Sequence, residues 1–190
     1  YNKFYKQGDF ARGGGKLKMV NVGSFVDKKN QTFLIDVSDV IRQKNIDFEL
    51  HFLGDGENRK AVEEKAKIMN LYNQIIFHGN VQNVNEYLWK SDIYVHSATY
   101  EPFGLVLLEA MAAGLPVISL DGKGNRDLIK QGKNGYMLFE QNAEEFAGKI
   151  IELWMDKKKY REISQYAQEF AKKYDIKEYV DSLLEIYREG

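Results

Sequence analysis

Short apolar runs alternate along the chain with segments in which apolar residues recur at the spacing of a helix. Several runs are apolar at nearly every position, which is typical of a strand covered on both faces of a sheet. The runs predict strands at Met19–Val22, Phe48–Leu53, Ile75–His78, Ile93–His96, Val117–Leu120 and Tyr136–Phe139.

Amphipathic helices are predicted between and after these strands. Within 33–41 the apolar residues fall at i, i+1, i+4, i+7 and i+8, which places them on one helical face. Because parallel strands need crossover connections, we expect an α/β fold. It would be a doubly wound, Rossmann-like parallel sheet of about six strands, with helices on both faces and at the C-terminal end. Further helical segments lie at 61–69, 84–88, 146–154, about 157–173 and about 176–188.

The pattern divides the chain into three parts. Residues 1–16 are polar and end in a run of glycines, which favours an interdomain linker over part of a core. The alternating elements predict one folded domain over 17–174, and the last predicted helix occupies 175–190. The first Met is Met19, inside an apolar run, so we expect the chain to be a piece of a longer protein.

Composition narrows the class of protein. Of 190 residues, 44% are hydrophobic and 29% charged, which is typical of globular domains. The net charge of -1 gives no general attraction to nucleic acid or to anionic membranes. Cys is absent, which excludes disulfides and a thiolate nucleophile in this chain. No apolar run approaches the roughly 18–20 residues of a membrane helix, so we expect a cytoplasmic protein.

The loop after the fourth predicted strand carries candidate chemistry, because ligands of doubly wound sheets bind at the carboxyl ends of the strands. If a helix begins near Gly104, the amides of Leu105 and Val106 are free donors at its positive end, where a phosphate binds readily. Gly104 itself lets a ligand approach without a Cβ in the way.

Two glutamates flank this helix start, with seven residues between them. Glu109, about one turn inside the helix, is placed to reach a pair of sugar hydroxyls, and Glu101 is placed to accept from hydroxyls further out. Each has a plainer interpretation when taken alone. Glu109 is also a favourable acid near a helix start, and Glu101 also fits a solvated loop residue.

Taken together, Glu101-Pro-Phe-Gly-x4-Glu109-Ala-Met-Ala-Ala-Gly-Leu-Pro-Val resembles the E-x7-E signature of glycosyltransferase family 4, in the GT-B class. The resemblance extends over about residues 18–188. The other landmarks that agree in order and spacing are Val22-Gly23 followed by Lys29-Asn30, Gly54-Asp55-Gly56, His78-Gly79-Asn80-Val81 and Asn134-Gly135-Tyr136.

The resemblance implies the C-terminal, nucleotide-sugar-binding half of a retaining, two-domain GT-B enzyme that uses no metal. On this interpretation 1–16 is a linker, 17–174 is the donor domain, and 175–190 crosses toward a separate N-terminal acceptor domain. No cofactor is implied beyond the nucleoside-diphosphate sugar, with UDP or GDP as the nucleotide. The isolated chain is expected to be inactive.

The resemblance also assigns roles to residues of this sequence. Glu109 would hold the ribose hydroxyls, Glu101 would contact the donor sugar near its anomeric carbon, and Lys29 would neutralise the diphosphate. Glu101 and Lys29 are thus the expected catalytic residues. The amides of Phe103 and Gly104 would meet the sugar, and those of Leu105 and Val106 the diphosphate. The expected binding set is completed by Gly23, Ser24, Gly54, Val81 and Arg126.

Ser24 departs from the family pattern, because members commonly carry Arg directly after the glycine of the first loop. Ser24 supplies a hydrogen bond but no charge. Arg126, in the loop after the fifth strand, is a candidate substitute. The plainer alternative is a surface arginine, or one that pairs with Asp127 or Glu101.

A metal site is not expected. His51, His78 and His96 lie at or near different strand ends without ligand spacing, so ordinary strand residues are expected, with His78 and His96 able to face the cleft. No Asp-x-Asp occurs in the chain.

The leading hypothesis is therefore a donor domain that moves a sugar from a nucleoside diphosphate to a glycan or a lipid-linked acceptor. A sugar-nucleotide epimerase or phosphorylase of the same fold is an alternative. A non-catalytic nucleotide-sugar-binding module is another, and Ser24 favours it. Lys157–Lys159 is interpreted as a solvated helix start, with peripheral contact to the inner face of a membrane as the sharper alternative.

Overall fold

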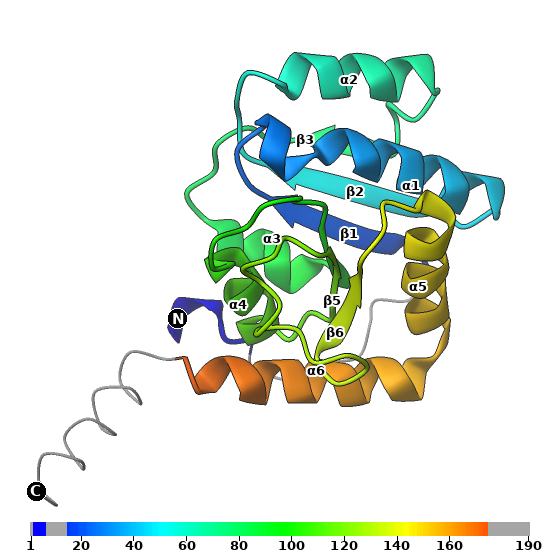
Figure 1. Ribbon diagram of the computed structural model, residues 1–190. Coiled ribbons are helices and arrows are strands. Elements are labelled where there is room, and N and C mark those ends of the chain that lie inside the picture. Colours follow the sequence, from blue (N-terminus) through cyan, green and yellow to red (C-terminus); the bar gives the residue numbers. More distant parts are fainter. Residues whose placement is uncertain (1, 7–14, 175–190) are drawn as a thin grey trace, which may run out of the picture.

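In the computed structural model, which describes residues 2–6 and 15–174, parallel strands form a six-stranded sheet in the order β3-β2-β1-β4-β5-β6 (Figure 1). The doubly wound sheet predicted from the sequence is confirmed, and the order reverses between β1 and β4. The strands are β1 Leu17–Val22, β2 Phe48–Leu53, β3 Ile75–Phe77, β4 Ile93–His96, β5 Val117–Leu120 and β6 Gly135–Leu138.

Helices cover both faces of the sheet. α1 packs against α2 and α5 on one face, whereas α3 and α4 lie on the other (Figure 1). α6 contacts both α4 and α5, and its bounds confirm the helix predicted at about 157–173. The predicted helix at 175–190 lies outside the described residues. The helices are α1 Gln31–Gln43, α2 Arg59–Ile68, α3 Val84–Lys90, α4 Leu105–Ala112, α5 Ala143–Met155 and α6 Lys157–Lys172.

The hydrophobic core forms two clusters, one on each side of the sheet. Successive residues of a strand point to opposite faces. Met19 of β1 therefore packs with β2, α1 and α5, whereas Val20 packs with Tyr94 of β4 and with α4 and α6. Both residues are at most 1% exposed. Burial on both faces explains why the neighbouring residues Met19 and Val20 are both apolar.

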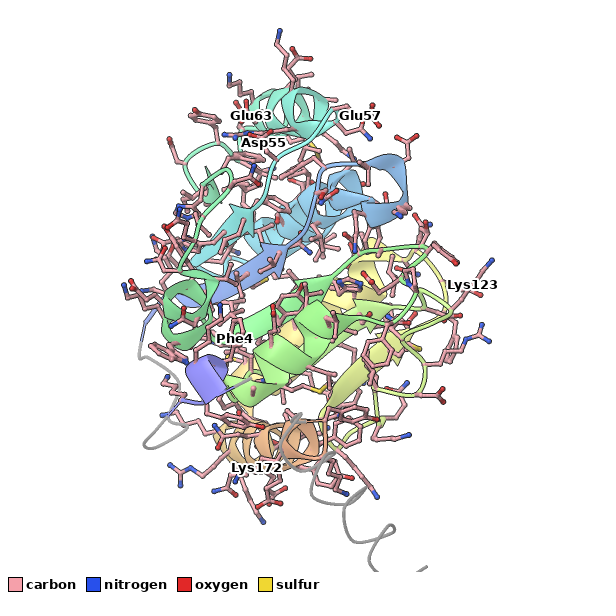
Figure 2. All side chains as sticks on the ribbon, turned by 90° about the vertical axis from the view of Figure 1, so that its left-hand side faces the viewer. Phe4, Asp55, Glu57, Glu63, Lys123 and Lys172 are labelled. Atoms are coloured by element: carbon pink, nitrogen blue, oxygen red, sulfur yellow. The ribbon has the colours of Figure 1, made fainter. Side chains whose placement is uncertain are left out.

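The N-terminal segment corrects one expectation. Phe4, in the short 3-10 helix η1 (Asn2–Phe4), is 5% exposed and lies beside α3 and α4, where Figure 2 labels it. Trp89 Nε1 donates to the Phe4 carbonyl oxygen at 2.8 Å, and Lys6 Nζ donates to the Trp89 carbonyl oxygen at 2.9 Å. The expectation that residues 1–16 lie outside the core is therefore wrong for Phe4, whereas Lys3 is exposed.

The connection between β5 and β6 contains no helix within residues 121–134, all of which the structure describes. Buried side-chain amides stabilise its turns instead. Asn125 accepts from the Gly122 amide at 3.0 Å, and Asn134 donates to the Leu128 carbonyl oxygen at 2.8 Å. Because side chains satisfy the backbone here, the chain crosses to the next parallel strand through an irregular loop.

Candidate functional site

Two loops meet where the carboxyl ends of β1 and β4 lie side by side, at the point where the strand order reverses. The loop after β1 contains a short 3-10 helix, η2 (Asp27–Lys29). Ser97 Oγ donates to the Lys29 carbonyl oxygen at 2.7 Å, and the Thr99 amide donates to the Lys28 carbonyl oxygen at 2.9 Å. These bonds hold the η2 loop against the loop that carries Glu101.

Lys29 and Glu101 form an ion pair across the two loops. Lys29 Nζ contacts Glu101 Oε2, and the side chains are only 18% and 11% exposed. The aliphatic part of Lys29 lies over Gly23, because a Cβ built on Gly23 would be 3.7 Å from Lys29 Cδ. Sequence reasoning named both residues but not their contact, which depends on how the two loops fold.

The loop after β5 supports Glu101 from behind. The Glu101 amide donates to the Gly122 carbonyl oxygen at 2.8 Å. A Cβ on Gly122 would lie 2.9 Å from Glu101 Cβ, and one on Gly124 would lie 2.2 Å from the Pro102 carbonyl oxygen. Only glycine permits this close approach, so the backbone of Glu101 is held in place from two sides.

His96 is a further member of the site that sequence reasoning did not connect to Glu101. It ends β4, is 1% exposed, and its Nε2 lies 3.4 Å from Glu101 Oε2. Among the described residues neither ring nitrogen has a hydrogen-bond partner, a condition that costs about 1–3 kcal/mol for a buried polar group. The sequence feature that could have indicated this role is the position of His96 at the carboxyl end of a strand, five residues before Glu101.

The groups around Glu101 favour its ionised form. His96 and Lys29 lower the pKa of Glu101 to about 2, against the opposing effect of burial. Burial lowers the pKa of His96, which is therefore neutral at neutral pH. The site thus combines a carboxylate, an ammonium and a neutral imidazole.

The start of α4 has the predicted form. Gly104 precedes it with a left-handed φ of 87°, and the Leu107 amide donates to the Gly104 carbonyl oxygen at 2.9 Å. The amides of Leu105 and Val106 therefore fall in the first turn, where no partner exists within the helix. They are available to an anion.

Side chains near this helix start are exposed or half-buried. Phe103 is 49% and Leu105 56% exposed. Glu109 is half-buried in α4, and burial raises its pKa against the opposing charge of Lys3. Lys3 belongs to η1, so the N-terminal segment also adds charge near this site.

A cavity of about 210 Å³ opens beside Gly23. Four of the sequence-predicted binding residues line it: Gly23, Ser24, Gly54 and Val81. Gly54 approaches Gly23 so closely that a Cβ would lie 2.1 Å from the Gly23 carbonyl oxygen. The remaining lining residues are Val22, Leu53, Asn80 and Val84.

Arg126 is engaged elsewhere. Its Nε and Nη2 donate to the two carboxylate oxygens of Asp121 at 2.9 and 2.6 Å, and its side chain is 59% exposed. The suggested pairings with Asp127 and with Glu101 are wrong, because the partner is Asp121. Ser24 lies in the cavity wall, where its carbonyl oxygen accepts from Gln31 Nε2 at 3.0 Å.

The other two histidines form a pair, with His51 on β2 and His78 directly after β3. His51 Nδ1 and His78 Nε2 are 2.9 Å apart, with the ring planes 8° apart and the centroids 5.2 Å apart. A nitrogen contact this short at that centroid distance places the rings side by side in one plane. No group of three or more side chains suited to a metal ion occurs within the residues that the structure describes.

The chain is similar in sequence to known glycosyltransferases. The family model described as glycosyl transferases group 1 matches residues 5–170. The poly(glycerol-phosphate) alpha-glucosyltransferase of Bacillus subtilis is 26% identical over 168 residues, covering 88% of this chain and 25% of that protein. The chain spans between a quarter and a half of the length of the curated relatives it matches.

Solved structures share the fold. The C-terminal domain of a glycosyl transferase group 1 family protein, LpcC, from Francisella tularensis is 27% identical with a TM-score of 0.78, covering 92% of this chain and 97% of that one. HepE from Anabaena in complex with UDP-glucose is 25% identical with a TM-score of 0.81, covering 92% of this chain and 49% of that one. In the described part of the chain, no helix has the length and apolar character to cross a membrane.

Proposed function

Since the chain belongs to the glycosyl transferases group 1 family, we propose that it is the donor-binding half of a retaining, metal-independent glycosyltransferase. It would act with a separate N-terminal domain on a glycan or a lipid-linked acceptor. The donor is a UDP- or GDP-linked sugar, an assignment supported by the complex of HepE with UDP-glucose.

The ion pair between Lys29 and Glu101 carries this proposal. It lies at the switch point of the sheet, beside the cavity that Gly23 lines and on the ligand-binding edge of such folds. A diphosphate offers Lys29 a stronger anion, and the hydroxyls of a sugar offer Glu101 donors in exchange. One ligand that carries both groups therefore satisfies both partners.

The residues then act as follows during transfer. The bond from the anomeric carbon to the diphosphate oxygen breaks, and the diphosphate leaves with the electron pair. A bond from the acceptor hydroxyl oxygen to the anomeric carbon forms, and the hydroxyl proton goes to the leaving diphosphate. Lys29 and the amides of Leu105 and Val106 would stabilise the developing negative charge. Glu101 would orient the sugar, and Glu109 the ribose.

A non-catalytic binding module is the second candidate, and one observation favours it. Ser24 brings no charge to the diphosphate, and Arg126 already pairs with Asp121. Lys29 is thus the principal side-chain cation that the described site offers. An active enzyme would need further cations from the N-terminal domain.

Location and partners follow the same proposal. We place the protein in the cytoplasm, without a nucleic-acid partner. Of the three lysines proposed for peripheral membrane contact, Lys159 is already paired with Glu152 at 2.8 Å. Such a contact would therefore rest on Lys157 and Lys158.

Calorimetric titration with UDP, GDP and ADP tests the donor assignment. We expect saturable binding of one nucleotide. Glu109→Ala should weaken this binding at least about tenfold, or about 1.4 kcal/mol, because the ribose contact is lost. Arg126→Ala should bind within about twofold of wild type, since Asp121 already holds that side chain. No binding of any nucleotide at millimolar concentration would count against the proposal, and unchanged affinity in Glu109→Ala would remove the ribose assignment.

Turnover and binding assays on the full two-domain protein distinguish an enzyme from a non-catalytic binding module. In an enzyme, Glu101→Gln should reduce turnover far more than it changes nucleotide affinity. If the wild-type protein binds nucleotide sugar and transfers nothing to any glycan or lipid-linked acceptor offered, the module is favoured.

A further inference from the structure

His96 is a buried imidazole whose hydrogen-bonding capacity is unused. It is 1% exposed, and neither ring nitrogen has a partner among the described residues. Buried polar side chains are nearly always hydrogen-bonded, so this one requires an explanation. β4 lies between β1 and β5, and a strand paired on both sides cannot shift to bring the ring to a new partner.

An acceptor within reach of His96 is already occupied. Nε2 lies 3.4 Å from Glu101 Oε2, the same oxygen that Lys29 Nζ contacts. Tyr94 packs near the imidazole ring, but its hydroxyl donates to the Val22 carbonyl oxygen at 3.2 Å. While Lys29 holds Oε2, the geometry between His96 and Glu101 is too poor for a hydrogen bond.

We propose that His96 is a positioning residue that takes over Glu101 when the diphosphate of the donor draws Lys29 away. This inference rests on the proposed function, in which Lys29 neutralises the diphosphate. Without Lys29, Glu101 is a buried carboxylate that has lost its cation. A small rotation then lets the N–H at Nε2 of His96 donate to Oε2, and Oε1 stays available to a hydroxyl of the sugar.

A neutral imidazole suits this transfer of partners. Burial lowers the pKa of His96, as does the charge of Lys29, against the opposing effect of Glu101. A neutral imidazole carries one N–H donor, so it orients the carboxylate without adding a second positive charge. The carboxylate then remains charged near the anomeric carbon, where positive charge develops.

Several groups surround Glu101 and enter any measurement of its titration. Lys29 faces it from η2, and His96 faces it from β4. Tyr94 lies on β4 near His96, and burial together with the charges of Glu101 and Glu109 raises its pKa. The loop after β5 contributes the backbone of Gly122. The test therefore compares variants that differ at one of these groups at a time.

A double-mutant cycle on this chain isolates the role of His96. Lys29→Met removes the ammonium but keeps the aliphatic stem, and so mimics departure of the cation. His96→Met removes the donor, whereas His96→Gln keeps an amide N–H near the place of Nε2. The pKa of Glu101 is read by carbon-13 NMR of labelled glutamate carboxyls, with Glu101→Gln to assign the signal.

We expect His96→Met to raise the pKa of Glu101 by at least about one unit, a tenfold change in acidity, when Lys29 is replaced. The rise should be smaller when Lys29 is present, because Lys29 then still pairs with Oε2, and His96→Gln should restore most of the wild-type value in the Lys29→Met background. An equal rise in both backgrounds, or none without Lys29, would overturn the proposal. Urea midpoints of the Met and Gln variants, which have similar size, identify any effect of misfolding.

Nucleotide binding separates this inference from the proposed function. If wild type binds UDP or GDP, saturating nucleotide should enlarge the effect of His96→Met on Glu101 just as Lys29→Met does, and an unchanged effect would contradict the inference. If neither nucleotide binds, the proposed function fails, while the cycle still decides whether His96 takes over Glu101. In the full-length enzyme, His96→Met should lower kcat about tenfold with KM within about twofold.

Discussion

Gly54 offers a direct test of how the cavity beside β1 is built. Its φ of 135° is a conformation that residues with a side chain rarely adopt, and a Cβ there would lie 2.1 Å from the Gly23 carbonyl oxygen. The obstacle is backbone, and the Gly23 amide is itself bonded to the Leu53 carbonyl oxygen at 2.9 Å. Gly54→Ala must therefore displace the loop that carries Ser24 and leads to Lys29.

Two effects contribute to the loss of stability expected for Gly54→Ala. The unfavourable φ costs on the order of 1–3 kcal/mol, and relief of the contact with Gly23 adds about 1–2 kcal/mol. We expect a loss of about 3 kcal/mol in the free energy of unfolding, which for a domain of this size lowers Tm by about 6–12 °C. Because the displaced loop lines the cavity, nucleotide affinity should also fall at least about tenfold.

Gly148 is the matched control for this substitution. It lies within α5, and a Cβ there meets nothing within 4 Å. Gly148→Ala should stabilise the protein by about 0.5–1 kcal/mol, because alanine is the better helix former. Thermal and urea unfolding of both variants give the comparison. A Gly54→Ala protein as stable as wild type would refute the close approach of the two loops.

Two further predictions concern the ion pair and the N-terminal segment. The pKa of Glu101 is depressed from 4.5 to about 2 in the folded state, so its contribution to stability is present above about pH 5 and is lost as the pH falls toward 2. Urea unfolding at pH 7 should show Glu101→Gln to be less stable than wild type by up to about 3 kcal/mol. This difference should shrink by about pH 3. A difference that does not change with pH would contradict the assignment. Phe4→Ala should lower the free energy of unfolding by about 3 kcal/mol, because Phe4 is buried against α3 and α4. The control Phe139→Ala, at a side chain that is 72% exposed, should change it by less than about 0.5 kcal/mol. Equal effects of the two substitutions in thermal unfolding would place Phe4 outside the core.

Elements with a strong local signal were predictable from the sequence. The predicted strands at 48–53, 93–96 and 117–120 match the structure residue for residue, because continuous or alternating burial leaves a direct mark on the apolar pattern. The family resemblance is also confirmed, since the family model matches residues 5–170. The start of α4 at Leu105 follows from Gly104 and the apolar run behind it.

Features that depend on contacts between distant segments were not predictable. Phe4 lies beside Tyr5 in an otherwise largely polar stretch without a regular apolar pattern, and only its neighbours in the fold reveal that it is buried. Arg126 carries no sign that Asp121 is its partner rather than Asp127, because the turn geometry decides which carboxylate it reaches. The convergence of Lys29 and His96 on one oxygen of Glu101 depends on three chain segments at once.

The contacts of α6 bear on how the protein folds. The Tyr160 hydroxyl donates to the Asp92 carbonyl oxygen at 2.8 Å, and Gln168 Nε2 donates to the carbonyl oxygens of Ala112 and Lys6, each at 3.0 Å. One helix thus joins the base of β4, the end of α4 and the N-terminal segment. Contacts of such long sequence separation slow folding, because closing the chain between them costs entropy. Until α6 has docked, the two layers of helices lack their common support, and the N-terminal segment lacks one of its anchors.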